Sequence, residues 1–143
     1  MGEDRVVATN RRARYDYHIL DTCEAGLVLA GAEVKSLRAG KASLGDAYAA
    51  PAGAEIFLYN LHIPAYDKNT AVPLETRRPR KLLLSRAEIR RIARAVDQKG
   101  VTLIPLKIYF ARGYAKVELA LARGKKQYDK REAIREKDDA KLK

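Results

Sequence analysis

The residues best suited to chemistry in this sequence are cations grouped in short clusters. The first cluster follows Asn10 and consists of Arg11, Arg12 and Arg14. Guanidinium groups donate several hydrogen bonds to phosphate oxygens, and a neighbouring asparagine amide can contact a base edge. The cluster therefore fits the backbone of a nucleic acid, although a solvated basic terminus would have the same composition.

Three further sets of cations follow along the chain. They are Lys35, Arg38 and Lys41; Arg77, Arg78, Arg80 and Lys81; and Arg86, Arg90 and Arg94. The first two sets fit either phosphate contact or solvated charge. For the third we favour solubility, because no aromatic side chain interleaves with its four-residue spacing.

Glu24 differs from its basic surroundings, because phosphates repel a carboxylate. Its oxygens can accept hydrogen bonds from amino or imino groups of unpaired bases, as can the amide of Asn10. The alternative is a turn residue between strands, which is the ordinary role of a glutamate beside Ala25-Gly26.

The whole chain shares this basic character. Its 143 residues include 29 Lys and Arg and 18 Asp and Glu, giving a formal net charge of +11. Nucleic acid is the first candidate partner, because neutralised phosphates release counterions, and an anionic membrane surface is the second. No apolar run approaches the ~20 residues that cross a bilayer, and residues 1–10 lack the apolar core of a signal peptide. We therefore expect a soluble, cytoplasmic protein without a membrane partner.

Enzymatic and metal-binding patterns are weak. Cys23 is the single cysteine, and the two histidines are His18 and His62, so no metal site is expected. No catalytic motif spacing joins these residues, and no phosphate-binding G-x-x-x-x-G-K-[ST] loop occurs. We predict a binding protein that is not an enzyme and uses no cofactor.

Hydrophobic patterning predicts the elements that must position these residues. Alternation indicates strands over 15–23, 27–29, 47–50, 55–63, 101–110 and 114–122. The first two should be joined by a turn or bulge at 24–26, and the last two by a type I′ turn at Arg112-Gly113. A short helix is predicted over 33–38 and a loop over 65–80. Ser85 and Glu88 form a capping-box pattern that opens a longer helix, with Gly100 at its stop.

About six strands, two helices and no βαβ alternation indicate a mainly β fold with peripheral helices. A small oligonucleotide-binding-like β-barrel fits this count, and such barrels bind RNA on surface strands and loops. Beyond Arg123 the large apolar side chains are too few to form a core helix. We predict a barrel domain with a basic arm over 1–127 and a basic tail over 128–143, disordered alone and helical when bound.

Five sequence strings together resemble the SsrA-binding protein family in order and spacing. They are NRRAR (10–14), EAG (24–26), EVKSLRAGK (33–41), RKLLL (80–84) and ARGKKQYDKR (122–131). The resemblance covers nearly the whole chain. It departs locally, since Tyr15 and Tyr128 stand where some members carry His, and Ser85 stands where some carry Asn.

The resemblance implies an RNA-binding factor of ribosome rescue. Its barrel would bind the tRNA-like part of transfer-messenger RNA (tmRNA) and deliver it to stalled ribosomes for trans-translation. Its tail would act in the small-subunit decoding centre and the mRNA channel. The ribosome is then a second partner, and elongation factor Tu is a candidate third through the RNA complex.

The resemblance also assigns residues. It implies that Asn10, Glu24, Leu83 and Ser85 bind the tRNA-like RNA, although for Ser85 the capping role is an alternative, and it favours RNA contact for Arg11, Arg12 and Arg14. We also expect RNA contacts from Lys35, Arg38 and Lys41. Ribosome contacts are expected from Lys125, Lys126, Tyr128, Asp129, Lys130 and Arg131. Tyr128 could stack on a ribosomal base or fold back on the barrel.

Two other functions fit the residues less well. One is a generic single-strand-binding barrel or ribosomal protein, which should tolerate any RNA of equal length. The other is a small RNA-modifying enzyme, which would need turnover and a mutation-sensitive nucleophile or base. A preference for the tRNA-like RNA that persists at moderate salt separates the first from the family function.

Overall fold

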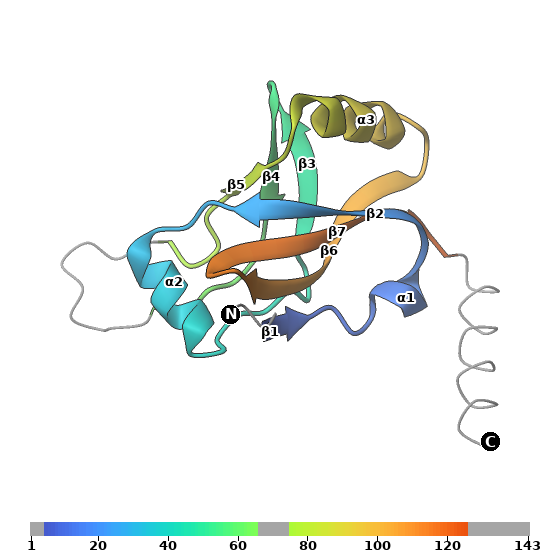
Figure 1. Cartoon of the computed structure of the whole chain (residues 1–143). Helices are drawn as coiled ribbons and strands as arrows, with labels where there is room; N and C mark the ends of the chain where they lie inside the picture. Colours follow the sequence, from blue (N-terminus) through green and yellow to red (C-terminus); the bar gives the residue numbers. More distant parts are fainter. Residues whose placement is uncertain (1–4, 66–74, 126–143) are drawn as a thin grey trace, which may run out of the picture.

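A computed structural model of the chain describes residues 5–65 and 75–125 (Figure 1). Its elements, in chain order, are β1 (Arg5–Thr9), α1 (Ala13–Asp16), β2 (Tyr17–Leu27), α2 (Gly31–Arg38), β3 (Tyr48–Ala52), β4 (Glu55–Tyr59), β5 (Arg80–Leu83), α3 (Arg86–Val96), β6 (Val101–Ala111) and β7 (Tyr114–Gly124). Strands dominate, and the helices lie around them, as the sequence predicts.

The strands close into a barrel. Their order is β6-β3-β4-β5-β2-β7, with β7 pairing back onto β6, and β1 is added along β6. All pairings are antiparallel. Closure leaves few free strand edges and presents a continuous outer surface. The predicted oligonucleotide-binding-like barrel is therefore confirmed.

Alternating side chains fill the barrel interior. Fully buried examples from four of its strands are Ile56, Leu58, Leu82, Leu103, Ile108, Val117 and Leu119. A second cluster lies on the opposite face of β6 and β7, where Ala13 of α1 packs with Ile104, Leu106, Ala120 and Ala122. This cluster fixes α1, and with it the basic arm, on the outside of the barrel.

The first two predicted strands are a single strand, so the predicted break at 24–26 is wrong. Glu24, Ala25 and Gly26 pair with Glu118, Val117 and Lys116 of β7, and the register shift lies earlier, between Ile19 and Asp21. Gly26 has a packing role here, because a Cβ on it would lie 3.1 Å from the Cβ of Leu83. The glycine allows β5 to approach β2 and is not a turn signal.

Three elements were not predicted from the sequence: β1, α1 and β5. Arg80, expected at the end of a loop, instead begins β5, and residues 66–74 of that expected loop lie outside the described residues. The predicted strand over 55–63 ends earlier, at Tyr59. Asn60 has a positive φ of 60°, which interrupts extended backbone, and His62 then makes an isolated bridge to Ser43.

Two local predictions are confirmed. Arg112 and Gly113 have φ values of 54° and 83°, as a type I′ turn between β6 and β7 requires. The Ser85 hydroxyl accepts a hydrogen bond from the Glu88 backbone N–H at 3.2 Å and caps α3. The helix over 33–38 is also present as α2, but it begins two residues earlier, at Gly31.

Candidate nucleic-acid interface

Neighbouring strands β2, β7 and β6 carry a lattice of charged side chains on their outer face. Glu24 of β2 lies opposite Glu118 of β7, and Glu118 lies opposite Lys107 of β6. Two residues before Glu118 on β7, Lys116 lies opposite Tyr109 of β6. Because side chains of cross-strand partners share a face, this surface presents two neighbouring carboxylates beside two cations.

Glu24 lies in the middle of this lattice, with its side chain 54% exposed. Its Oε2 atom accepts a hydrogen bond from the Tyr109 hydroxyl, and its Oε1 atom lies 4.0 Å from Nζ of Lys116. Glu24 therefore lies within a strand, and its exposed carboxylate is oriented by the hydrogen bond from Tyr109. The interpretation as a turn residue is wrong.

The basic arm joins this lattice through Arg11 and Arg14. Both side chains line a shallow hollow together with Lys107 and Glu118, which belong to the lattice. Asn10 fixes the arm, because its backbone N–H donates to Leu106 O at 2.7 Å and its side-chain amide donates to Pro105 O at 3.2 Å. The structure thus brings Arg11, Arg14 and the Glu24 surface together.

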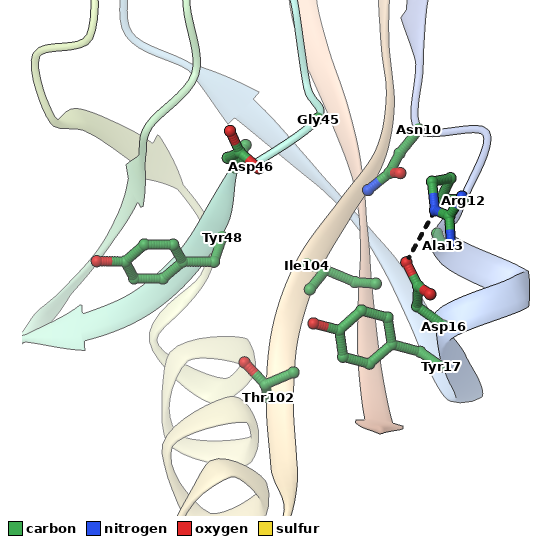
Figure 2. Close-up of a pocket in the computed structure, with 11 residues that line it drawn as sticks. Asn10, Arg12, Ala13, Asp16, Tyr17, Gly45, Asp46, Tyr48, Thr102 and Ile104 are labelled. Carbon is green, nitrogen blue, oxygen red and sulfur yellow. Dashed lines mark hydrogen bonds and ion pairs between the residues drawn. The ribbon is translucent and has the colours of Figure 1, made fainter. Parts of the chain in front are cut away.

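Arg12 lies on a different side of α1. Its guanidinium lies 4.8 Å from the centroid of the Tyr15 ring, and its Nε atom lies 3.5 Å from Oδ2 of Asp16. It lines a separate pocket, in which Figure 2 shows the Arg12–Asp16 pair across from Asp46. The three arginines of the cluster therefore do not form one surface.

The same pocket has two aromatic walls. Tyr17 contributes a ring that points toward Thr102, as Figure 2 shows, and Tyr48 lies on the opposite side. Tyr48 also stacks on Tyr59, with ring centroids 5.3 Å apart. Two carboxylates against one guanidinium make this pocket unsuitable for a phosphate.

Leu83 extends the Glu24 surface across β5. It pairs with Gly26, two residues from Glu24 along β2, and it is 55% exposed. Leu83 can therefore make an apolar contact with a ligand, beside the hydrogen-bond acceptor that Glu24 provides. Ser85 follows, but its hydroxyl is used to cap α3.

The cations on and after α2 lie apart from this surface. Lys35, Arg38 and Lys41 are exposed on and after α2. Arg38 lies over the ring of Phe110, near the hairpin end of β6, with 5.0 Å from its guanidinium carbon to the ring centroid. This set is thus placed at one end of the barrel.

Arg78 and Arg80, from the set of cations over 77–81, form a buried ion cluster with Glu33 of α2. Arg80 is 0% exposed and Glu33 is 4% exposed. Arg80 donates from Nε to Oε2 of Glu33 at 2.7 Å, and its other nitrogens donate to the Leu61 and Thr76 carbonyls. Arg78 also donates to both Glu33 oxygens. Solvated charge and direct phosphate contact are therefore both wrong for Arg80, since it joins β5 to α2.

The cluster also sets the protonation of Glu33. Burial alone would raise the pKa of its carboxyl, but hydrogen bonds from Arg78, the Ala30 backbone N–H and Arg80 outweigh burial and hold the pKa below its usual value. Burial in turn lowers the pKa of Arg80, against the effect of Glu33. The pair stays ionised at neutral pH.

The sequence does contain one signal for the burial of Arg80. Arg80 alternates with Leu82, so both side chains lie on the core-facing side of β5.

Helix α3 is tied to β2 by Arg91. Its guanidinium pairs with Asp21 of β2 and with Glu88 one turn earlier in α3. The hydrogen bond from Arg91 lowers the pKa of the Asp21 carboxyl. The remaining arginines of this helix, Arg86, Arg90 and Arg94, are exposed, as their expected role in solubility requires.

Cys23 is poorly suited to act as a nucleophile. Burial, with a further contribution from Glu88, raises the pKa of the Cys23 thiol, which lowers its thiolate fraction and its reactivity. Over residues 5–65 and 75–125, no three His, Cys, Asp or Glu side chains gather as a metal site would need. Within the same ranges, no helix is long and apolar enough to cross a membrane.

Lys125 marks where the barrel ends. Its backbone N–H donates to the carbonyl of Asp16 at 2.8 Å, so the chain leaves β7 beside α1. The other residues expected to contact the ribosome, Lys126, Tyr128, Asp129, Lys130 and Arg131, lie outside the described residues.

Comparisons with known proteins agree with one another. Residues 7–143 match the family model described as "SmpB protein". An SsrA-binding protein of Methylobacterium nodulans is 56% identical over 135 residues, covering 94% of this chain and 86% of that protein. One from Frankia casuarinae is 55% identical over 136 residues, covering 95% and 86%.

A solved structure described as "tmRNA-SmpB: a journey to the center of the bacterial ribosome" also matches. It is similar with a TM-score of 0.71 and 53% sequence identity, covering 90% of this chain and 94% of that chain. The likeness therefore extends from sequence to barrel. This chain belongs to the SmpB protein family.

Proposed function

We propose that this protein binds the tRNA-like part of tmRNA and delivers it to stalled ribosomes for rescue by trans-translation. The observation that carries the proposal is the shared outer surface of Arg11, Arg14, Glu24 and Leu83, on a chain whose relatives are named SsrA-binding proteins. The structural relative is described as tmRNA–SmpB at the bacterial ribosome. Both lines favour this RNA over a generic single strand.

Each side chain on this surface has a distinct task in the proposal. Arg11, Arg14 and Lys107 neutralise phosphates and position the RNA without reading its sequence. Glu24 accepts a hydrogen bond from an unpaired base, and Leu83 packs against a base or sugar. Asn10 contributes mainly by fixing the arm, because its amide already donates to Pro105.

The remaining predicted contacts lie around this centre. Lys35, Arg38 and Lys41 supply a separate group of cations at the hairpin end of the barrel, and Arg12 lies on the other side of α1. Ser85 contributes by starting α3 directly after Leu83 and Leu84. These residues supply charge and positioning, while Glu24 supplies discrimination.

The tail completes the proposed mechanism. Residues 128–143 would act in the decoding centre and the mRNA channel, with Lys125, Lys126, Lys130 and Arg131 contacting ribosomal RNA, Asp129 beside them and Tyr128 stacking on a base. The barrel over 1–127 would hold the tmRNA meanwhile. The protein thus acts in the cytoplasm by binding alone, without turnover, and elongation factor Tu would meet it through the RNA complex.

Reconstituted translation on a message without a stop codon tests this function. Ribosomes stalled at the message end, alanine-charged tmRNA, elongation factor Tu and this protein should together yield peptides that carry the tmRNA-encoded tag. Omitting the protein should abolish the tag. Tagging at the same rate with and without the protein would contradict the proposal.

A further inference from the structure

The hydrogen bond between Tyr109 and Glu24 crosses a strand. Tyr109 belongs to β6 and Glu24 to β2, and β7 pairs with both. Two strand spacings separate these backbones by about 10 Å. The Tyr109 hydroxyl nevertheless reaches Oε2 of Glu24 over the outer side of β7. The contact therefore fixes the direction in which the carboxylate points on this surface.

Tyr109 is itself held in place. It is only 7% exposed, although its hydroxyl reaches an exposed side chain. Val6 of β1 and Lys116 of β7 flank it in the sheet, and Nζ of Lys107 lies 5.2 Å from the centroid of its ring. A buried ring with a polar tip is well suited to orient a partner, because few rotamers are open to it.

Lys116 is a second possible partner for the Glu24 carboxylate, and the hydrogen bond from Tyr109 keeps the carboxylate from turning toward it. Nζ of Lys116 lies 4.0 Å from Oε1, beyond the range of a close charge-assisted hydrogen bond. A carboxylate released from Tyr109 could turn and close on this ammonium group. The Glu24 carboxylate and the Lys116 ammonium would then form a close ion pair. Neither group would be available to bind a ligand on the same surface.

We infer that Tyr109 is a positioning residue for RNA recognition, whose hydroxyl orients Glu24 to accept a hydrogen bond from an unpaired base. The inference rests on the proposed function, because that function makes Glu24 an RNA contact. Tyr109 lies outside the five strings of residues that carry the family resemblance and outside every cationic cluster of the sequence. The 85-residue separation between Tyr109 and Glu24 becomes a contact only through the β2-β7-β6 pairing.

Removing the hydroxyl alone tests the inference. The full-length chain carrying Tyr109→Phe keeps the ring and should lose roughly fivefold or more in affinity for the tRNA-like part of tmRNA, since a hydrogen bond to a charged group is lost. Tyr114→Phe is the matched control, because Tyr114 lies in the same hairpin and is 71% exposed. Its affinity should equal that of the wild type.

A double-mutant cycle separates positioning from a merely structural role. In a Glu24→Ala background, Tyr109→Phe should change RNA affinity by less than about twofold, because the residue to be positioned is gone. Full additivity of the two losses, or an unchanged affinity of Tyr109→Phe alone, would overturn the inference while leaving the proposed function intact. A wild-type chain that binds ordinary tRNA as tightly as the tRNA-like RNA would overturn the proposed function and the inference with it.

Discussion

Arg80 and Glu33 form a buried ion pair that joins the first residue of β5 to the third residue of α2, with 2.7 Å from Nε to Oε2. The pair ties two segments that are 47 residues apart. It also holds α2, which carries Lys35 and Arg38, against the barrel. The orientation of those two cations therefore depends on a contact that neither of them makes.

Replacing Arg80 should be among the most destabilising single changes outside the apolar core. Arg80→Ala leaves the Glu33 carboxylate buried with only Arg78 and the Ala30 backbone N–H for compensation, which costs about 3–5 kcal/mol of unfolding free energy. Lys81→Ala is the matched control, because Lys81 is the next residue in β5 and its ion pair with Glu55 is exposed. Its loss should be below about 1 kcal/mol. Urea denaturation of both variants measures their free energies of unfolding. Equal losses would show that the buried ion pair stabilises the fold no more than the exposed one does.

Glu33 should also make stability depend on pH. Its folded pKa is lower than its unfolded pKa, so its contribution is present above the unfolded value and is lost as pH falls through the folded value. Glu33→Gln should therefore flatten the acid side of a stability-against-pH curve, at pH values below the ordinary glutamate pKa of 4.5. Thermal unfolding at several pH values gives this curve. Parallel curves for the wild type and Glu33→Gln would contradict the stated direction of the shift.

Arg11 and Arg12 should differ in their effect on RNA binding, although they are adjacent. Arg11 lines the hollow beside Lys107 and Glu118, whereas Arg12 pairs with Asp16 in another pocket. Arg11→Ala should lower the slope of log affinity against log salt by about one unit, as expected for one lost phosphate contact. Arg12→Ala should lower it by clearly less. Equal slopes for both variants and the wild type would remove the arm from the interface.

The chain truncated after Gln127 should keep its fold and its tmRNA affinity but fail to support tagging. The last strand of the barrel, β7, ends at Gly124, and the Lys125 backbone N–H donates to Asp16 O, so the truncation removes none of the described strands and helices. Circular dichroism, tmRNA binding and tagging on stalled ribosomes measure the three properties. A triple alanine variant at Tyr128, Lys130 and Arg131 should imitate the truncation. Normal tagging by the truncated chain, or loss of its RNA affinity, would contradict the assignment of tmRNA binding to the barrel and of ribosomal action to the tail.

Local patterns in the sequence predict the local parts of this structure. Alternation over 101–122 gave the β6–β7 hairpin, and the spacing of Ser85 and Glu88 gave the start of α3, because both features depend on neighbours in the chain. The short strands β1 and β5 were missed, since five and four residues carry little periodic signal. Gly26 was misinterpreted as a turn residue, because only the approach of Leu83 explains why it must be a glycine.

The same division holds for the site. Glu24 and Arg11 could be proposed from residue types and the family resemblance. Their common surface depends on the pairing of β2, β7 and β6, and no local pattern contains it. The separation of Arg12 from Arg11 and Arg14 depends on α1, whose four residues were not predicted. Long-range register therefore decides which of the predicted cations can act together.

The specificity ratio between the tRNA-like part of tmRNA and an ordinary tRNA tests the central claim most directly. We predict that the wild-type chain prefers the tRNA-like RNA at moderate salt as well as at low salt, because base contacts resist screening more than phosphate contacts do. Glu24→Ala should lose about 1–3 kcal/mol of binding free energy for that RNA, with much less effect on the ordinary tRNA and little change in melting temperature. Equal affinities of the wild-type chain for the two RNAs at every salt concentration would contradict the account, and would indicate a generic RNA-binding barrel.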